Sequence, residues 1–249
     1  MGRVHVSSDG TVRRVVLARP EKRNALSLAM LAALEAAFPA NPPASERVAV
    51  VSAEGPTFCA GIDLSAHFPD GEAAIEMAFR AIERYPLPVV AVVAGDAVGG
   101  GAELALHCDV VVAADSARFS MPLARLGLTP PWLFTVKLVD VAGLALAREL
   151  LLVGDAVAAP RLAELGVISR VVAGESLGAS VDSIVGAIAA GAPLSLRALK
   201  AALVRAGEIR AGLPHEDVDE LSRRAGKSED AREGMRARLE KRSPVFDGC

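Results

Sequence analysis

Two uninterrupted apolar runs, residues 48–52 and 89–93, constrain the fold of this chain most strongly. A run without polar alternation is typical of a strand that is covered on both faces, as in a parallel sheet. Each run leads into small or glycine residues, at 58–64 and 99–104, where the next element would begin. Strands that alternate with helices predict βαβ units and a mostly parallel sheet.

The remaining pattern completes an α/β chain. Further strands are expected at 12–18, 110–113 and 167–172. Helices are expected at 28–38, where Ser27 would be the N-cap, and up to Leu106, as well as at 71–85, 132–139, 144–152, 159–165, 177–190, 194–210, 215–224 and 228–241. We therefore predict an α/β core over residues 1–190 and a helical region over residues 191–249.

Composition narrows the class of protein. The 249 residues are 52% hydrophobic and 23% charged, which predicts a globular chain. A net charge of −3 gives no basic surplus for nucleic acid or an anionic membrane. Cys59, Cys108 and Cys249 follow no disulfide or zinc pattern, so we expect a reducing, cytoplasmic setting and no bound metal. Neither a signal peptide nor an apolar run long enough for a membrane helix is recognisable.

The glycine-rich segment carries the strongest chemical signal. Gly99, Gly100 and Gly101 permit positive φ and a close approach of the backbone to a ligand. The first N–H groups of a helix attract negative charge, so two such segments facing one cavity could hold an oxyanion. Glu103 would lie on the same helix face as Gly100. The alternatives are a tight strand-to-helix turn, and a glutamate that complements the helix dipole.

Several short motifs follow one another along nearly the whole chain. They are Arg-Pro-Glu-Lys-Arg-Asn-Ala-Leu at 19–26, the segments at 58–64 and 99–104, Ala-Leu-His-Cys-Asp at 105–109, Ala-Arg-Phe at 117–119, Arg-Leu-Gly-Leu at 125–128 and Glu-Lys-Arg-Ser-Pro-Val-Phe at 240–246. On these residues the chain resembles the crotonase superfamily, the enoyl-CoA hydratase/isomerase family. The resemblance implies the crotonase (ClpP/crotonase-like) α/β fold, with repeated ββα units and a C-terminal helical trimerisation region. It also implies a homotrimer or a dimer of trimers.

The resemblance implies a reaction as well. Members of the family bind acyl-CoA thioesters, and two main-chain N–H groups stabilise the thioester enolate. The matching groups on this chain are the N–H groups of Ile62 and Gly100, and Glu103 matches a catalytic acid/base. Coenzyme A is part of the substrate, so no separate cofactor is implied.

Contacts with CoA are implied at a set of loop and helix-end positions. The set comprises Arg23, Ala25, Ala60, Ile62, Asp63, Leu64, Gly100 and Lys241. In relatives the loop that holds Arg19, Lys22 and Arg23 lies along the CoA nucleotide, and basic residues at the end of the last helix reach the phosphates. A solvated surface charge is the alternative for each basic residue. Asp63 is expected to support its turn rather than to react.

One position departs from the hydratases of the family. They carry a second catalytic glutamate where this chain has Leu123. Leucine moves no proton, and the loss of an acid–base group costs roughly 10²–10⁴ in rate. Three functions therefore stay open: a hydratase, an isomerase that needs only Glu103, and a protein that binds acyl-CoA without turnover.

Other side chains could replace the missing carboxyl. The candidates are His67, Asp70, Glu72 and Glu76, which follow the first oxyanion segment. His67 is the candidate that titrates near neutrality. Trp132 and Phe134 either line the acyl pocket or belong to the core. No partner is evident for the remaining histidines, His5, His107 and His215.

Two unrelated classes of protein compete with this interpretation. The glycines at 95, 99, 100 and 101 do not fit the dinucleotide-binding pattern, and no lysine follows them as in a P-loop. Residues 174–178 do match the G-x-S-x-G pattern of serine hydrolases, and Asp182 and His215 follow in hydrolase order. No strand is expected after Ser176 to carry those partners, which argues against a hydrolase.

Overall fold

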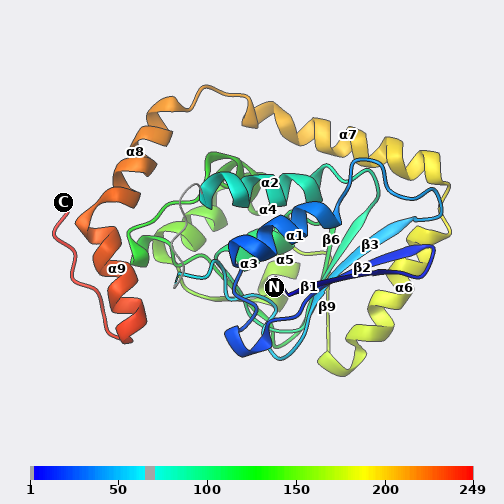
Figure 1. Ribbon diagram of the computed structural model, residues 1–249, viewed down its shortest axis with the longest axis horizontal. Helices are drawn as coiled ribbons and strands as arrows, with labels where there is room; N and C mark the ends of the chain where they lie inside the picture. Colours follow the sequence, from blue (N-terminus) through cyan, green and yellow to red (C-terminus); the bar gives the residue numbers. More distant parts are fainter. Residues whose placement is uncertain (1–2, 65–70, 249) are drawn as a thin grey trace.

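The computed structural model of the chain describes residues 3–64 and 71–248 (Figure 1). Its centre is a six-stranded sheet in the order β1-β2-β3-β4-β6-β9. Neighbouring strands pair in parallel, except β1 with β2. The mostly parallel sheet expected from the apolar runs is confirmed. The strands are β1 (Val4–Ser8), β2 (Val12–Leu17), β3 (Val48–Ala53), β4 (Val89–Val93), β6 (Val110–Ala114) and β9 (Arg170–Val172).

Helices cover both faces of this sheet, which explains its uninterrupted apolar strands. On one face α1 (Leu28–Ala37), α2 (Gly71–Glu83) and α3 (Gly100–Leu106) build the main core. On the other face α6 (Leu177–Ala189) packs against the alternate residues of the same strands, such as Val50. The Ser27 side chain accepts a hydrogen bond from the N–H of Met30, so the expected cap of α1 is confirmed.

A second, three-stranded sheet lies beside the first and was not expected from the sequence. It joins β5 (Ala97–Val98), β7 (Arg118–Ser120) and β8 (Val157–Ala158). Strands of two or three residues carry no periodicity of their own, so contacts between distant segments define them. The N–H of Gly99 donates to the carbonyl of Ser120 at 2.8 Å, so this small sheet fixes the start of α3.

The segment after the second sheet is helical. α4 (Trp132–Arg148) continues into a π-helical turn at Glu149–Val153, and α5 (Ala159–Glu164) follows. Gly143 has φ 69° and interrupts α4. The interruption lies between the two helices expected at 132–139 and 144–152.

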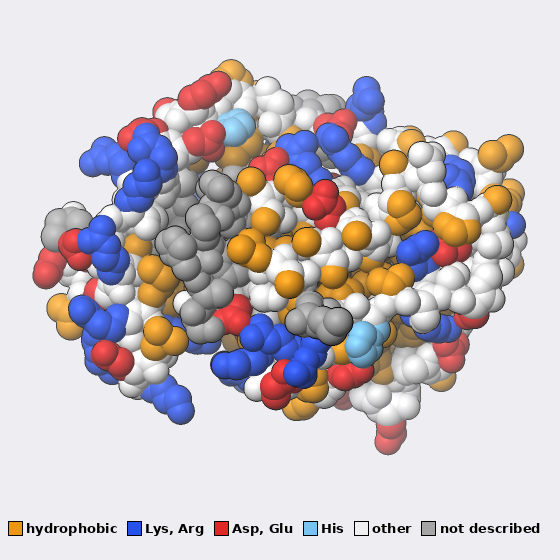
Figure 2. Space-filling model, viewed as in Figure 1, with side chains coloured by type: hydrophobic (Ala, Val, Ile, Leu, Met, Phe, Trp, Pro, Cys, Tyr) orange, Lys and Arg blue, Asp and Glu red, His pale blue; other side chains and the backbone are white. Residues whose placement is uncertain are grey.

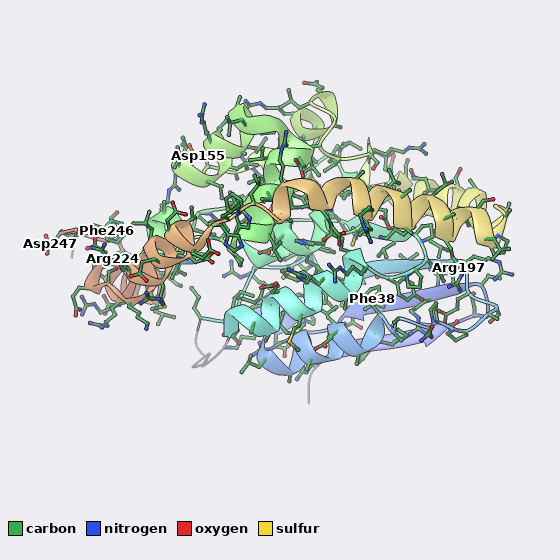
Figure 3. The ribbon with its side chains drawn as sticks, turned by 90° about the horizontal axis from the view of Figure 1, so that it is seen from above. Phe38, Asp155, Arg197, Arg224, Phe246 and Asp247 are labelled. Carbon is green, nitrogen blue, oxygen red and sulfur yellow. The ribbon has the colours of Figure 1, made fainter. Side chains whose placement is uncertain are left out.

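Three helices form the end of the chain: α7 (Pro193–Ala211), α8 (Glu216–Lys227) and α9 (Glu229–Glu240). Figure 1 shows α7 along the top of the molecule and α8 and α9 down its left side. In Figure 3, Arg197 of α7 lies toward one end of the molecule and Asp247 at the other, so this region spans its length. The helices expected after residue 190 are confirmed, whereas the division of the chain at that residue stays a prediction.

Two further features bear on function. Within the described ranges no single helix is both long and apolar enough to span a membrane; α6 and α7 meet the criterion only as a pair bent by 105°. Among the same residues, no cluster of three or more His, Cys, Asp or Glu side chains could hold a metal ion.

Candidate active site

The two segments singled out in the sequence lie side by side. Cys59 and Ala97 form a parallel bridge, and the N–H of Val98 donates to the carbonyl of Cys59 at 2.9 Å. A side chain at Gly101 would place its Cβ 2.3 Å from the carbonyl oxygen of Cys59. Only glycine permits this approach, so Gly101 holds the start of α3 against the first segment.

The N–H groups of Ile62 and Gly100 come together at this junction. Gly100 is the first residue of α3, so its N–H has no partner within the helix. In the parallel bridge between Leu26 and Ile62, the N–H of Leu26 donates to the carbonyl of Gly61, and the carbonyl of Leu26 accepts from the N–H of Asp63. The N–H of Ile62 takes no part in the bridge and therefore faces away from Leu26. A Cβ built on Gly100 would lie 3.7 Å from the nitrogen of Ile62. The main chains at Ile62 and Gly100 are therefore neighbours, and two main-chain donors at this junction could serve one oxygen atom.

A polar network supports the first of these segments. Arg19 donates to the Asp63 carboxylate at 2.6 Å and to the carbonyl of Ala25 at 3.1 Å. Asn24 is fully buried with φ 55°, and its amide donates to the carbonyls of Glu54 and Thr57. No role for Asn24 is recognisable in the sequence, although asparagine tolerates left-handed backbone better than other non-glycine residues. The contact between Arg19 and Asp63 links the turn at Asp63 to the loop that contains Asn24.

The residues expected to contact CoA occupy two places. Most of them lie together beside Gly100, because the N–H of Ala60 donates to the carbonyl of Arg23 and the bridges described above join the neighbouring segments. This group consists of Arg23, Ala25, Ala60, Ile62, Asp63 and Leu64. Lys241 lies apart, as the C-cap of α9. Arg23 and Lys241 are exposed, whereas the neighbouring Arg242 pairs with Glu233 and Glu240. Figure 2 shows Lys and Arg side chains gathered near the 3-10 turn Pro20–Lys22 and over the C-terminal helices.

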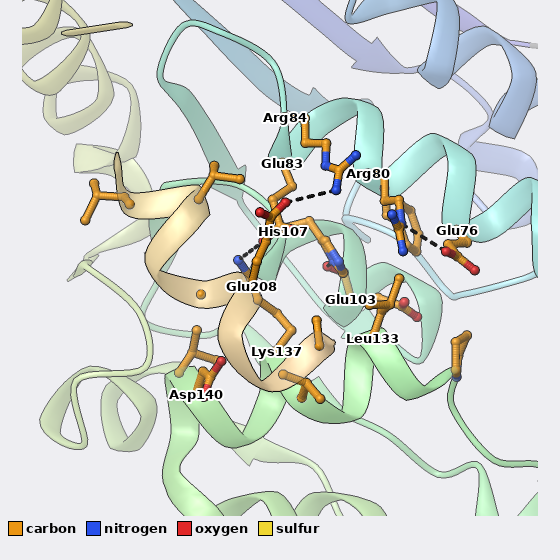
Figure 4. Close-up of a pocket in the computed structure, with 18 of the residues that line it drawn as sticks. Glu76, Arg80, Glu83, Arg84, Glu103, His107, Leu133, Lys137, Asp140 and Glu208 are labelled. Carbon is orange, nitrogen blue, oxygen red and sulfur yellow. Dashed lines mark hydrogen bonds and ion pairs between the residues drawn. The ribbon is translucent and has the colours of Figure 1, made fainter. Parts of the chain in front are cut away.

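Glu103 lies on α3, one turn after Gly100, and faces a cavity of about 430 Å³. The cavity lies between α2, α3, α4 and α7 (Figure 4). Glu103 is only 7% exposed, and burial raises the pKa of its carboxyl to about 8. Near neutral pH this group can therefore both donate and accept a proton.

The other charges that line the cavity are paired. Lys137 donates to Glu83 at 2.7 Å and Arg84 to Glu208 at 2.9 Å, and further pairs join Arg80 with Glu76, Lys200 with Asp109 and Arg210 with Asp140. Among the described acids in this lining, Glu103 is the one without an ion pair. Its pKa is raised by desolvation, with no cation to oppose it.

Comparison with known proteins decides the family. The sequence profile described as enoyl-CoA hydratase/isomerase matches residues 7–249. The chain belongs to the enoyl-CoA hydratase/isomerase family. It is 34% identical to a 2,3-dehydroadipyl-CoA hydratase of Escherichia coli (strain K12) over 100% of both chains, and 33% identical to a probable enoyl-CoA hydratase of Mycobacterium leprae over 96% of both.

The fold agrees with the sequence comparison. An enoyl-CoA hydratase from Mycobacterium avium subsp. paratuberculosis superposes with a TM-score of 0.89 at 27% identity, over 99% of both chains. The α/β crotonase fold with a C-terminal helical region is thereby confirmed. The protein is an enzyme of the hydratase/isomerase family, and acyl-CoA is its class of substrate.

Leu123, the departure from the family's hydratases, contributes to packing. It is half-buried at the start of the 3-10 turn Ala124–Leu126 and packs against the main core. Its carbonyl accepts hydrogen bonds from the N–H groups of Leu126 and Leu128. Leu123 is not among the described residues that line the Glu103 cavity.

The candidate substitutes for the missing family glutamate have separate outcomes. His67, Asp70 and the side chain of Glu72 lie outside the described residues. Glu76 lines the cavity but pairs with Arg80. Phe134 is wholly buried in the core, and Trp132 stacks on His215 at a ring distance of 5.2 Å beside a neighbouring hollow.

His107 lines the same cavity, a position that was not expected from the sequence. Its ring lies between Phe79 and Phe134, at centroid distances of 5.4 and 6.1 Å. Nδ1 lies 2.9 Å from the main-chain oxygen of Glu103. Burial lowers the pKa of His107 to about 4. The spacing of four residues from Glu103 was the available signal, because positions i and i+4 share a helix face.

The serine-hydrolase alternative finds no support in the fold. Ser176 lies at the start of α6, and His215 directly precedes α8, at the opposite end of the molecule (Figure 1). His215 pairs with Asp219, not with Asp182 of α6. The three residues of the hydrolase pattern are therefore not brought together.

Proposed function

We propose that the protein stabilises the enolate of an acyl-CoA thioester, with the N–H groups of Ile62 and Gly100 as oxyanion donors and Glu103 as the acid/base. One observation carries the proposal: the two amides are neighbours, and a buried carboxyl with a pKa of about 8 lies one helical turn away. Donors already in place where charge develops stabilise a transition state without reorganisation.

The proposed step balances with a single carboxyl. The Glu103 carboxylate removes a proton from the carbon next to the thioester carbonyl or from a conjugated position, and the electron pair moves onto the carbonyl oxygen. The protonated carboxyl then returns the proton to another carbon of the conjugated system, which moves the double bond. A pKa near the working pH suits such a shuttle.

Leu123 favours isomerisation over hydration. Addition of water across a double bond employs one group to activate water and another to deliver the proton, and Leu123 supplies neither. Double-bond migration needs only the Glu103 shuttle. Hydration and binding without turnover are the remaining candidates for this site.

The test is mass spectrometry of crotonyl-CoA and a 3-enoyl-CoA incubated with the protein in D₂O. Migration of the double bond with deuterium uptake supports the isomerase, and gain of water identifies a hydratase. Glu103→Gln should reduce turnover roughly 10²–10⁴-fold with CoA-ester binding retained. Glu164→Gln, an exposed glutamate on α5, is the matched control. Equal activity of Glu103→Gln and the wild type would remove Glu103 from the mechanism.

The remaining elements of the proposal concern the setting of the protein. The exposed side chains of Arg23 and Lys241 suit contacts with CoA phosphates, and exposed leucines on α7 to α9 suit a homotrimer or a dimer of trimers. The free, buried thiols of Cys59 and Cys108 suit a cytoplasmic location. The net charge of −3 favours neither nucleic acid nor membrane as a partner.

A further inference from the structure

His107 presents a hydrogen-bond acceptor to the cavity that holds Glu103. Its Nδ1 lies 2.9 Å from the main-chain oxygen of Glu103, and a carbonyl oxygen can only accept, so Nδ1 carries the proton. A neutral imidazole with Nδ1 protonated has a free lone pair on Nε2. The ring stays neutral at pH 7, because burial lowers the pKa of His107 to about 4.

The Nε2 atom is accessible from the cavity. His107 is part of the cavity lining, and in the described portion of the chain Nε2 has no hydrogen-bond partner. Unlike the described polar atoms that are fully buried without a partner, Nε2 keeps some solvent-accessible surface. Figure 4 shows the ring close to Glu103 within the lining.

The direction of this acceptor is fixed. Phe79 and Phe134 both stack with the ring, at interplanar angles of 30° and 27°. The bond from Nδ1 to the carbonyl of Glu103 prevents rotation within the stack. A ring held in this way cannot turn its acceptor away from an occupant of the cavity.

The position of His107 along the helix sets where it would meet a substrate. Glu103 is three residues after Gly100, and His107 is four residues further, which adds about 6 Å at the rise of an α-helix. An acyl chain whose thioester oxygen lies at Gly100 would pass Glu103 first. It would meet His107 several carbons beyond the reacting carbons.

The surroundings make this acceptor distinctive. Leu133, Val136, Leu203 and Val204 line the cavity with apolar groups, and the neighbouring charges of Glu83 and Lys137 are paired with each other. Among the described ionisable side chains of the lining, Glu103 and His107 are the two without an ion pair, and such polar groups set orientation and specificity in a pocket. A plain alkyl chain would displace water from Nε2 and offer no hydrogen-bond donor in its place.

We propose that His107 is a specificity-determining residue, whose Nε2 accepts a hydrogen bond from a hydroxyl group on the acyl chain, beyond the carbons that Glu103 serves. The substrates are then acyl-CoA thioesters with a hydroxylated acyl group rather than a plain alkyl chain. This inference rests on the proposed function, because it requires the acyl group to enter the cavity from the Gly100 side.

The test is isothermal titration calorimetry with saturated esters, which bind without reacting. The ligands are hexanoyl-CoA and its 4-, 5- and 6-hydroxy derivatives. The wild type should bind at least one hydroxy ester roughly tenfold more tightly than hexanoyl-CoA, as expected for one satisfied buried hydrogen bond. The O-methyl ether of that ester retains the oxygen but lacks the donor, and it should bind no better than hexanoyl-CoA.

His107→Phe provides the second comparison, because phenylalanine preserves the stack between Phe79 and Phe134. This variant should lose the preference for the hydroxy ester and bind hexanoyl-CoA at least as well as the wild type. His5→Phe, on an exposed position of β1, is the matched control and should keep the preference. If His107→Phe does not fold, the ether comparison on the wild type still decides the matter.

The outcomes separate the inference from the proposed function. Equal affinity for hexanoyl-CoA and all three hydroxy esters would overturn the role of His107 and leave the proposed function intact. Equal affinity for the hydroxy ester and its ether would overturn the hydrogen bond. Failure of every ester to bind would overturn both.

Discussion

At the scale of single residues, the site depends on close approaches between main chains. Gly100 and Gly101 are neighbours, but they face different surroundings. A Cβ on Gly101 would lie 2.3 Å from the main-chain oxygen of Cys59, whereas one on Gly100 would lie 3.0 Å from Cδ1 of Ile62. The first contact is with backbone, and the second is with the end of a flexible side chain.

This contrast predicts different effects for two alanine substitutions. Gly101→Ala should lower the free energy of unfolding by about 3 kcal/mol, because the backbone of Cys59 cannot move without breaking the bridge to Ala97. Gly100→Ala should cost less than about 1 kcal/mol but reduce turnover roughly 10²-fold through displacement of Ile62. Urea denaturation and steady-state kinetics measure the two effects. Similar stability of the two variants would contradict the contrast between the backbone contact at Gly101 and the side-chain contact at Gly100.

The buried carboxyl of Glu103 should also shape the pH dependence of stability. Its pKa rises from 4.5 to about 8 on folding, so the folded state retains a proton that the unfolded state releases between these values. The wild type therefore loses stability through this group as the pH rises across that window. Glu103→Gln should gain stability over the wild type by a few kcal/mol at pH 8, and by little at pH 4.5.

Denaturation of both proteins at pH 4.5, 6 and 8 measures this difference. His107 has the opposite dependence, because its pKa is lowered to about 4 and the unfolded state binds the proton first as pH falls. That contribution is common to both proteins and cancels in the comparison. A difference that does not change with pH would contradict the buried carboxyl.

At the scale of elements, polar pairs hold α7 over the cavity. Lys200 is only 5% exposed, and its Nζ lies 2.6 Å from both carboxylate oxygens of Asp109. Asp109 also accepts from the N–H of Val89, so the pair joins α7 to the central sheet. Arg84, the residue after α2, and Glu208 of α7 make a second, more exposed connection.

Removal of these two connections should have unequal costs. Lys200→Met leaves Asp109 as a partly buried charge without its cation and should lower the free energy of unfolding by about 2 kcal/mol. Arg84→Met removes an exposed pair and should cost less than about 1 kcal/mol. Urea titrations of the two variants provide the comparison. An equal or reversed order would show that burial does not set the strength of these contacts.

Among the elements, those buried on both faces were predictable from the sequence, and those defined by distant contacts were not. The runs that became β3 and β4 were recognisable because they are buried on both faces and uninterrupted. β1 was missed because it is short and mostly exposed, and β5 because a two-residue strand depends on distant partners. Within the site, Glu103 was predictable from local helix spacing. The same spacing places His107 on the helix face of Glu103, but the stacking of His107 with Phe79 and Phe134 and the hydrogen bonds of Asn24 were not predictable, because tertiary contacts create them.

At the scale of the whole molecule, the C-terminal helices combine a tight contact with exposed apolar side chains. α9 lies so close to the turn at Gly127 that a Cβ there would be 2.6 Å from Cα of Ala231. The same region exposes Leu194 and Leu199 on α7 by 82% and 61%. Leucines this exposed on one region are typical of a surface that another subunit covers.

We expect sedimentation equilibrium to show a trimer or a dimer of trimers at micromolar concentration. The double variant Leu194→Asp/Leu199→Asp should shift the equilibrium toward smaller species, because charge replaces apolar contact area. Leu152→Asp, at an equally exposed leucine in the π-helical turn outside this region, is the matched control. A monomeric wild type would contradict the expectation.

The pair of amides at Ile62 and Gly100 has a consequence for how this enzyme can be dissected. Both donors belong to the peptide backbone, so an alanine scan leaves them in place and would register only indirect effects at these positions. An ester linkage introduced at either residue by semisynthesis removes the N–H and keeps the side chain. The two hydrogen bonds proposed for the enolate oxygen are therefore not removed by side-chain substitution, and chemical synthesis can delete them one at a time.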